Sequence, residues 1–307
     1  MYRIYENTCM EVLGPLLFLV FINDLPNTVQ SGIKIFADDT KLYNKANLPG
    51  TVLALQDDVN RALKWSAEWQ LPFNIDKCAV LHIGSNNPLH DYTMGGLVLK
   101  KTSAERDLGV IIDGELKFRQ QAATAISKAN RVLAVIRKSF AHIDKFTLPL
   151  LYKTLVRPLL EYGNASWGPF NRADEKSLER IQRRATRLVG SIRGLLYTDR
   201  MRALKLPSLY YRRRRGDMIR VYQLLHGAID QDPNKFLHLD VSSRTRGHRW
   251  KLLKPTAVTR TRRAAFSIRI INDWNSLPSQ VVEAHSLNQF KARLDSHWAH
   301  LMYDIPD

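Results

Sequence analysis

The chain has 307 residues, of which 45% are hydrophobic and 24% charged, and its formal net charge is +17 at pH 7. This length and composition predict a globular protein with two or three cores and exclude a disordered one. Its two cysteines, Cys9 and Cys78, exclude a disulfide framework and a cysteine-rich zinc site. We therefore expect an intracellular protein, in the nucleus or the cytoplasm.

The positive charge is concentrated in the last two thirds of the chain. Residues 1–100 carry 8 Lys and Arg against 10 Asp and Glu, whereas residues 101–307 carry 38 against 19. A field of this sign attracts polyanions. Nucleic acid is therefore the first expected partner, and an anionic membrane surface is the second.

An apolar run at residues 13–22 is the first element in the chain. It is too short to span a bilayer, and Glu11 before it and Asn23-Asp24 after it are not the flanks of a signal peptide. We expect no signal peptide and no transmembrane segment, and of the two candidate polyanions we expect nucleic acid and not a membrane to be the partner. Residues 13–25 instead predict a buried helix that packs beneath the next element.

Residues 32–43 predict a β-hairpin with two adjacent acids, Asp38 and Asp39, at its tip. Apolar and other side chains alternate along residues 33–37, and residues 40–43 form a second short strand. Two neighbouring carboxylates repel each other, so they suit either a solvated turn or a site where a divalent cation compensates their charge. The pair alone does not decide between these interpretations.

The next elements alternate between helix and strand. Residues 51–70 predict an amphipathic helix with Asp57 and Asp58 outside and its tryptophans in the core. Residues 75–83 predict a strand that carries Lys77. Considered without any further information, Lys77 is interpreted as an ordinary solvated lysine. Two further short strands are predicted at 92–99 and 108–112, with turns at 95–96 and 113–114.

Beyond residue 115 the apolar period changes from two to about 3.6. Helices are predicted at 118–141, at 146–157 with an end near Pro158, and at 172–193. The last of these has one apolar side, and its opposite side carries Arg180, Arg183, Arg184 and Arg187. A solubilising face usually mixes charges of both signs, so four arginines favour contact with phosphates.

Four consecutive arginines, Arg212, Arg213, Arg214 and Arg215, belong to another predicted helix that ends near Gly227. They point around the whole helix, so they cannot all reach one partner. Contact with nucleic acid and a nuclear-import signal are the two interpretations of this run. Residues 230–263 predict a basic linker rich in loops, which includes Ser242, Ser243, Arg244 and Arg246. A final pair of helices is predicted at 262–274 and 287–301, the second capped by Ser286. This tail is expected to dock through the apolar residues Trp274, Leu287, Phe290, Leu294 and Trp298.

Two strings, LGPLLFLVFINDLP at residues 13–26 and FADDTKLY at residues 36–43, together resemble the reverse transcriptase of non-LTR (LINE-type) retrotransposons. The resemblance continues from there over most of the chain. It is carried by the segments at residues 65–78, 92–96, 107–110, 151–162 and 212–217. The order and spacing of these short motifs make the match specific.

The resemblance implies an α+β fold in three parts. Residues 1–114 would form a partial polymerase palm of antiparallel strands packed on helices, residues 115–170 a helical thumb, and residues 171–307 a basic, mainly helical C-terminal region. The implied activity is that of an RNA-directed DNA polymerase, a nucleotidyltransferase that uses an RNA template, a DNA primer, deoxynucleoside triphosphates and two Mg²⁺ ions. Asp38 would be a metal ligand, Asp39 its companion acid, and Lys77 the lysine that assists pyrophosphate departure.

The sequence departs from this pattern in ways that bear on activity. The third carboxylate of the metal site and the fingers should precede Gly14-Pro15 and are not in this sequence, and Cys9-Met10 stands where the family has Gln-Gly. Asp24 is the nearby acid that might substitute, but a capping or loop role fits it better. We therefore expect an N-terminally truncated, inactive fragment that still binds nucleic acid. The alternatives are a non-catalytic RNA- or DNA-binding protein built from the thumb and basic C-terminal region, and a relic with no selected role.

Overall fold

A computed structural model describes residues 3–240 and 247–305, with side chains from Leu13 onward. Ser242, Ser243, Arg244 and Arg246 of the predicted linker therefore lie outside the described residues. The chain is α+β, and it divides into two compact units. The first unit comprises Met1–Glu105 with Asp113–Glu115, and the second comprises Arg106–Ile112 with Leu116–Asp307.

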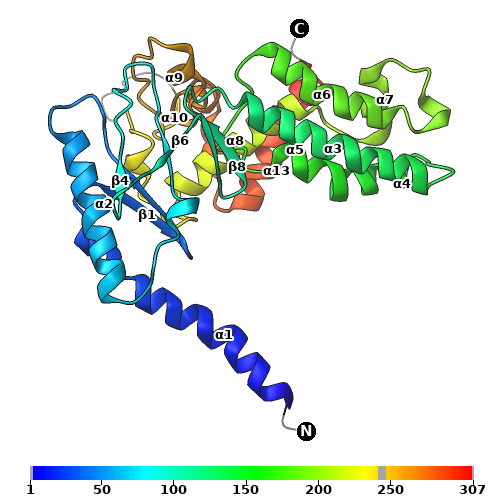
Figure 1. Ribbon diagram of the computed structural model, residues 1–307. Coiled ribbons are helices and arrows are strands. Elements are labelled where there is room, and N and C mark those ends of the chain that lie inside the picture. The colour runs from blue at the N-terminus through cyan, green and yellow to red at the C-terminus, as the bar shows by residue number, and fades with distance from the viewer. Residues whose placement is uncertain (1–2, 241–246, 306–307) are drawn as a thin grey trace. The chain divides into compact units, whose positions relative to one another are not determined.

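The first unit combines two long helices with short paired strands (Figure 1). Its helical elements are α1 (Arg3–Ile22), η1 (Leu25–Thr28), α2 (Thr51–Glu68) and η2 (Ile75–Lys77). Its paired strands are β1 (Gly32–Phe36) with β2 (Asp39–Tyr43), β4 (Thr93–Met94) with β5 (Leu97–Val98), and β3 (Ala79–Leu81) with β6 (Lys100–Thr102). The first two pairs are antiparallel and the third is parallel. The division between the units falls within a further hairpin of β7 (Ala104–Asp107) and β8 (Val110–Asp113).

The hairpin predicted at residues 32–43 is confirmed, and residues 92–99, predicted as a short strand with a turn at 95–96, form a second hairpin from β4 and β5. Phe36 pairs with Asp39 across the first turn, so the register puts the acidic pair at the tip as expected. In the second hairpin Gly95 and Gly96 have φ of 59° and 81°, a conformation that glycine adopts without strain. The alternation in β1 is also observed, because Ile33 and Ile35 pack toward Trp65 of α2.

The helix at residues 13–22 is present as the end of α1, but the prediction that it is buried is wrong. Leu16, Leu17 and Val20 are exposed, Val20 by 76%. Of the α1 side chains that the structure describes, Phe18 and Ile22 join the core, where they pack with the hairpin and α2. The apolar run is longer than the surface that these elements offer, so its preceding turns stay uncovered by the described residues.

Asp58 corrects the predicted outer face of α2, because its side chain is fully buried. Its two oxygens accept hydrogen bonds from the backbone N–H groups of Gln30 (2.9 Å) and Ser31 (2.6 Å), and Arg61 pairs with it at 2.8 Å. Burial by itself raises the pKa of this carboxyl, but the hydrogen bonds from Ser31 and Gln30 and the charge of Arg61 together hold the pKa below its ordinary value. Asp58 thus ties α2 to the segment that precedes the β1–β2 hairpin.

Replacing Asp58 with Asn should lower the free energy of unfolding by about 1–3 kcal/mol, because the amide N–H₂ cannot accept the second backbone hydrogen bond. The contribution of Asp58 is complete above its ordinary pKa of 3.8 and is lost as the pH falls through the lower pKa of the folded state. Urea unfolding of both proteins at pH 7 and pH 3 checks this; the difference should shrink at the lower pH. The exposed neighbour Asp57 supplies the matched control, Asp57→Asn, and an equal loss in both variants would contradict the assignment.

Residues 75–83 do not form the single strand that was predicted. A short 3₁₀ turn, η2, comes first, with Asn74 accepting a hydrogen bond from the N–H of Lys77, and only β3 follows as strand. The strands β6 and β7 were not predicted. Strands of three or four residues depend on partners distant in sequence, as β3 does on β6, so their own pattern carries little signal.

The second unit is mainly helical. Its helical elements as far as residue 225 are α3 (Arg119–Ser139), α4 (Thr147–Leu151), η3 (Tyr152–Val156), α5 (Arg157–Glu161), α6 (Arg172–Thr186), η4 (Gly190–Ile192), α7 (Tyr197–Leu204) and α8 (Leu209–Leu225). Those that follow in the described residues are η5 (Pro233–Lys235), α9 (Arg260–Ala264), α10 (Phe266–Arg269), α11 (Ile271–Asn275), α12 (Ser279–Val282), α13 (Leu287–His297) and η6 (Ala299–Leu301). One hydrophobic cluster joins α3 to α6, and another joins α8 to α11–α13. Figure 1 shows α3, α5 and α6 side by side in green.

Three helix predictions in this unit need correction. The helix expected to end near Pro158 continues to Glu161. A π-helical turn, η3, leads into α5, and Pro158 lies in the first turn of α5, where its missing N–H would have no helical partner. The helix expected at 262–274 is three short helices, broken at Ala265, whose backbone is extended. The helix expected at 172–193 ends at Thr186, and α7 was not predicted.

The docked tail is confirmed. Trp274, Phe290 and Leu294 are fully buried, and the Ser286 hydroxyl caps α13 by accepting a hydrogen bond from the N–H of Gln289 at 3.2 Å. Within the stretches that the structure describes, no helix is both long and apolar enough to cross a bilayer.

Candidate functional site

The acidic pair lies where the β1–β2 hairpin turns. Ala37 and Asp38 form the two-residue turn, Ala37 with a φ of 50°, and Asp39 is the first residue of β2. Both carboxylates are exposed, and so is Phe36 beside them, by 63%. The hairpin therefore presents two oxygen-rich side chains to solvent from adjacent positions.

The fit of this pair to a divalent ion can be judged from the donors around it. Carboxylate oxygens are the donors that Mg²⁺ prefers, and two adjacent groups supply part of a coordination sphere. Among the described residues, however, no three His, Cys, Asp or Glu side chains gather closely enough to hold a metal ion. These residues therefore do not by themselves form a complete two-metal site.

The other residues predicted near this site have separate positions. Lys77 is exposed in η2, and no ion pair joins it to Asp38 or Asp39 in the described part of the chain. Asp24 accepts a hydrogen bond from the Trp65 indole N–H at 3.1 Å, which fixes the chain between α1 and α2. The structural role expected for Asp24 is thus observed.

The arginine face of α6, defined as Arg180, Arg183, Arg184 and Arg187, is exposed along its whole length. The opposite side of α6 is buried through Leu178, Ile181 and Ala185, as the helical period indicated. The side-chain carbonyl of Asn171 caps the helix by accepting the N–H of Asp174 at 2.8 Å. Among the described residues no carboxylate forms an ion pair with any of these four arginines; the recorded contacts are with neutral groups, from Arg184 to Asn130 at 2.6 Å and from Arg183 to the Tyr197 ring at 4.8 Å.

Arg200 of α7 adds a buried cation beside this face, a residue that no sequence pattern indicated. Its side chain donates to the Thr186 hydroxyl at 3.0 Å and to the Leu195 carbonyl at 2.6 Å, and no carboxylate pairs with it within the described residues. Burial lowers the pKa of Arg200, and the nearby charges of Arg187 and Arg183 lower it further. A buried cation among like charges is costly unless a neighbouring group compensates it, and the Tyr197 ring lies against this guanidinium, with its centroid at 5.6 Å.

The run Arg212–Arg215 has partners inside the second unit. Arg212 forms a bidentate pair with Glu161, Arg214 with Asp273 at 2.8 Å for both bonds, and Arg215 with Asp295 at 2.5 and 2.8 Å. Arg213 donates to the Leu160 carbonyl at 3.3 Å and lies over the Trp167 ring, 5.4 Å from its centroid. Each of the four therefore stabilises the packing of α8 against neighbouring segments. Their contact with nucleic acid stays a prediction.

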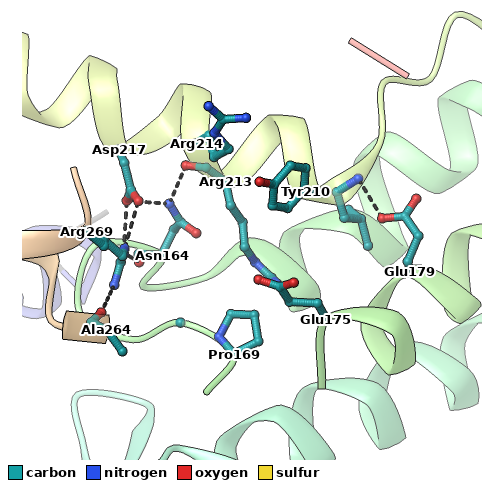
Figure 2. A pocket seen from close by; sticks show the side chains of 12 residues that line it. Asn164, Pro169, Glu175, Glu179, Tyr210, Arg213, Arg214, Asp217, Ala264 and Arg269 are labelled. Atoms are coloured by element: carbon teal, nitrogen blue, oxygen red, sulfur yellow. Dashed lines mark hydrogen bonds and ion pairs between the residues drawn. The ribbon is translucent and has the colours of Figure 1, made fainter. Parts of the chain in front are cut away.

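A cavity of about 230 Å³ lies beside this run, and a network of ion pairs and hydrogen bonds forms one side of it (Figure 2). Arg269 binds both oxygens of Asp217 at 2.9 Å and donates to the Asn164 carbonyl at 2.8 Å. The Asn164 amide in turn donates to Asp217 at 3.0 Å. Burial raises the pKa of Asp217, and the Arg269 charge opposes that rise. Since the polar groups of this network satisfy one another, we assign it a structural role.

The site thus consists of an exposed acidic pair on a hairpin and an α6 arginine face that no carboxylate among the described residues pairs with. Comparison with curated proteins places the similarity of the chain in one class of enzyme. The chain is similar to RNA-directed DNA polymerases of mobile elements, which confirms the resemblance to non-LTR reverse transcriptases. One relative is the RNA-directed DNA polymerase from mobile element jockey of Drosophila funebris, 28% identical over 73% of this chain and 25% of its own length. Others are the probable RNA-directed DNA polymerases from transposon X-element (23% identical, 65% of this chain, 23% of its own length) and from transposon BS (25%, 58% and 21%), both of Drosophila melanogaster.

The chain spans about a quarter of the length of the curated relatives it matches. No family model matches the chain, and no solved structure matches it significantly.

Proposed function

We propose that this chain is the part of a non-LTR retrotransposon reverse transcriptase that carries one side of the palm and the surface that holds the primer and template. In this proposal residues 1–114 form a partial palm, residues 115–170 the thumb, and residues 171–307 the basic C-terminal region. The similarity to RNA-directed DNA polymerases and the α+β fold support it. An RNA template and a DNA primer are the corresponding partners.

The observation that carries the nucleic-acid part of the proposal is the exposed arginine face of α6 with Arg200 beside it. Intramolecular ion pairs neutralise Arg212, Arg214 and Arg215, whereas no carboxylate among the described residues pairs with the α6 arginines. Four guanidinium groups on one helix face, none of them paired with a carboxylate in the described residues, favour an anionic partner over a neutral one. A phosphate backbone supplies such a row of negative charges. Binding of an RNA–DNA duplex that weakens steeply with salt tests this surface.

For catalysis we propose that Asp38 and Asp39 are the palm acids that contribute to a Mg²⁺ site, with Lys77 near the leaving pyrophosphate, as the resemblance implies. Two-metal phosphoryl transfer depends on positioning and charge compensation, and the loss of one ligand removes most of both. The described residues supply no cluster of three donors. We therefore propose that deoxynucleoside triphosphates become substrates only when a further carboxylate, from outside these residues, completes the set.

The 307-residue chain should not extend an oligo(dT) primer on poly(rA) with Mg²⁺ and dTTP, or should do so only at a trace rate. Incorporation of radiolabelled dTTP measures this directly, with a complete retroviral reverse transcriptase as the positive control. Asp38→Ala should change nothing in this assay. Robust extension by the unaltered chain that Asp38→Ala abolishes would show that the metal site is complete after all.

A non-catalytic RNA- or DNA-binding protein is the second candidate, because the arginine face of α6 does not involve Asp38 or Asp39. The two candidates agree on binding and differ on catalysis. Restoring extension by adding a palm and fingers fragment of a related enzyme would favour the polymerase.

A further inference from the structure

A second cavity of the second unit, with a volume of about 680 Å³, lies between the end of α8, residues 249–250 and the segment from Gln280 to Arg293. Cavities of roughly 300–1,000 Å³ hold ligands of nucleotide size. Its lining includes the rings of Tyr222, His226 and Trp250, together with Arg249 and Arg293. This combination differs from the cavity beside Arg213, whose polar groups satisfy one another.

Four rings form a continuous ladder from the core to this cavity. Phe290 stacks on Tyr222 with 4.4 Å between ring centroids, and Tyr222 stacks on His226 with 4.0 Å and an angle of 15° between the planes. The Trp250 ring follows at 4.9 Å from His226. Phe290 and Tyr222 are buried, whereas Trp250 is half-buried, so the ladder ends at the cavity. Successive aromatic planes of this kind form a platform on which a base can continue the stack.

The charge at the end of the ladder is positive. The exposed Arg249 guanidinium lies over the Trp250 ring, 5.5 Å from its centroid, and Arg293 donates a hydrogen bond to the Gln280 carbonyl at 2.5 Å. Neither arginine forms an ion pair with a carboxylate among the described residues, and Glu283 is the single acid in the described lining. The guanidinium groups are therefore available for a phosphate.

We propose that this cavity binds an unpaired nucleotide of a single-stranded nucleic acid, with the base stacked against Trp250 and the flanking phosphate bound by Arg249 and Arg293. The Arg249 guanidinium either packs on the face of the base opposite Trp250 or moves away from the Trp250 ring to bind the phosphate. A base in a duplex cannot reach such a site, because its faces are already stacked on its neighbours. The inference rests on the proposed nucleic-acid function and adds a second site, specific for single strands, to the duplex surface on α6.

Fluorescence anisotropy of the full chain with three labelled probes tests the proposal: a 15-nucleotide uridine strand, a blunt RNA–DNA duplex, and the same duplex with a single-stranded uridine overhang. Trp250→Ala should weaken binding of the single strand about tenfold and remove the gain in affinity that the overhang gives. Binding of the blunt duplex should not change. Trp250→Phe should retain most of the single-strand affinity, because a stacking face remains.

Arg249→Gln should also weaken single-strand binding, whereas Lys235→Gln, which removes one charge at an exposed position, should not. Photocrosslinking of the unaltered protein to a 5-bromouridine strand, followed by mass spectrometry, should mark the peptide that contains Trp250; this measurement keeps the test valid if Trp250→Ala fails to fold. An unaltered single-strand affinity in Trp250→Ala, an equal loss on the blunt duplex, or crosslinks only elsewhere would overturn the proposal. If instead no probe binds the unaltered chain, the proposed nucleic-acid function itself fails, and the two failures are thus distinguishable.

Discussion

Replacing Arg180, Arg183, Arg184 and Arg187 together with Glu should abolish detectable binding of an RNA–DNA duplex at about 0.1 M salt. The four side chains are exposed on one face of α6, and no carboxylate in the described part of the chain neutralises them. If each contacts one phosphate, replacing all four with Gln should make the plot of log affinity against log salt concentration shallower by about 3 to 4. Anisotropy titrations between 50 and 300 mM NaCl measure both effects.

The matched control reverses four exposed lysines of the first unit, Lys34, Lys45, Lys64 and Lys100, and so makes the same change in net charge. This control should retain most of the duplex affinity, and Asp38→Ala should retain all of it. Arg200→Gln should weaken duplex binding in the same direction as the α6 variants, provided that its thermal unfolding shows a folded protein. Equal losses from the α6 and control variants would mean that binding follows net charge and not the arginine face.

Arg269→Ala should lower the free energy of unfolding of the second unit by about 3–5 kcal/mol. Asp217 is buried, and Arg269 supplies its cation through two hydrogen bonds of 2.9 Å. Removal of one partner leaves an uncompensated buried charge, which is far more costly than removal of both. Since domains are stable by only about 5–15 kcal/mol, such a loss is readily measured by urea unfolding.

The double variant Arg269→Ala with Asp217→Ala should cost less than the sum of the two single variants, because the buried carboxylate is then absent. Arg262→Ala, at an exposed arginine of the neighbouring α9, is the control and should change stability by less than about 0.5 kcal/mol. Additive losses in the double variant would show that the Asp217–Arg269 pair is not coupled as the distances indicate.

The elements that could be predicted from sequence are those whose pattern is local. The arginine face of α6 was predicted because a period of 3.6 residues fixes which side chains share a face. The hairpin tip at Asp38 and Asp39 was predicted because alternation and turn residues lie within a dozen positions. The resemblance to reverse transcriptases has the same origin, since its motifs are short strings of adjacent residues.

The errors concern burial and pairing between distant residues. Asp58 was assigned to the outer face of α2, yet it binds backbone N–H groups 27 and 28 positions earlier in the chain. The apolar run of α1 was predicted to be buried, but how much of it is covered depends on the extent of the surface formed by the hairpin and α2. The helix at 146–157 was predicted to end near Pro158 because proline breaks a helix interior, but the π-helical turn before α5 places this proline in the first turn of a helix, where it is tolerated.

By itself, the sequence determined where the acids and arginines stand along the chain, which of them share a helix face or a turn, and which class of protein they resemble. Only the tertiary structure decided which of those charges are available to a partner. Arg212, Arg214 and Arg215 find carboxylates that lie 51, 59 and 80 positions away, whereas the α6 arginines find none in the described residues. The physical reason is that periodicity is a property of neighbouring residues, while the neutralisation of a charge depends on whatever the fold brings within a few ångströms of it.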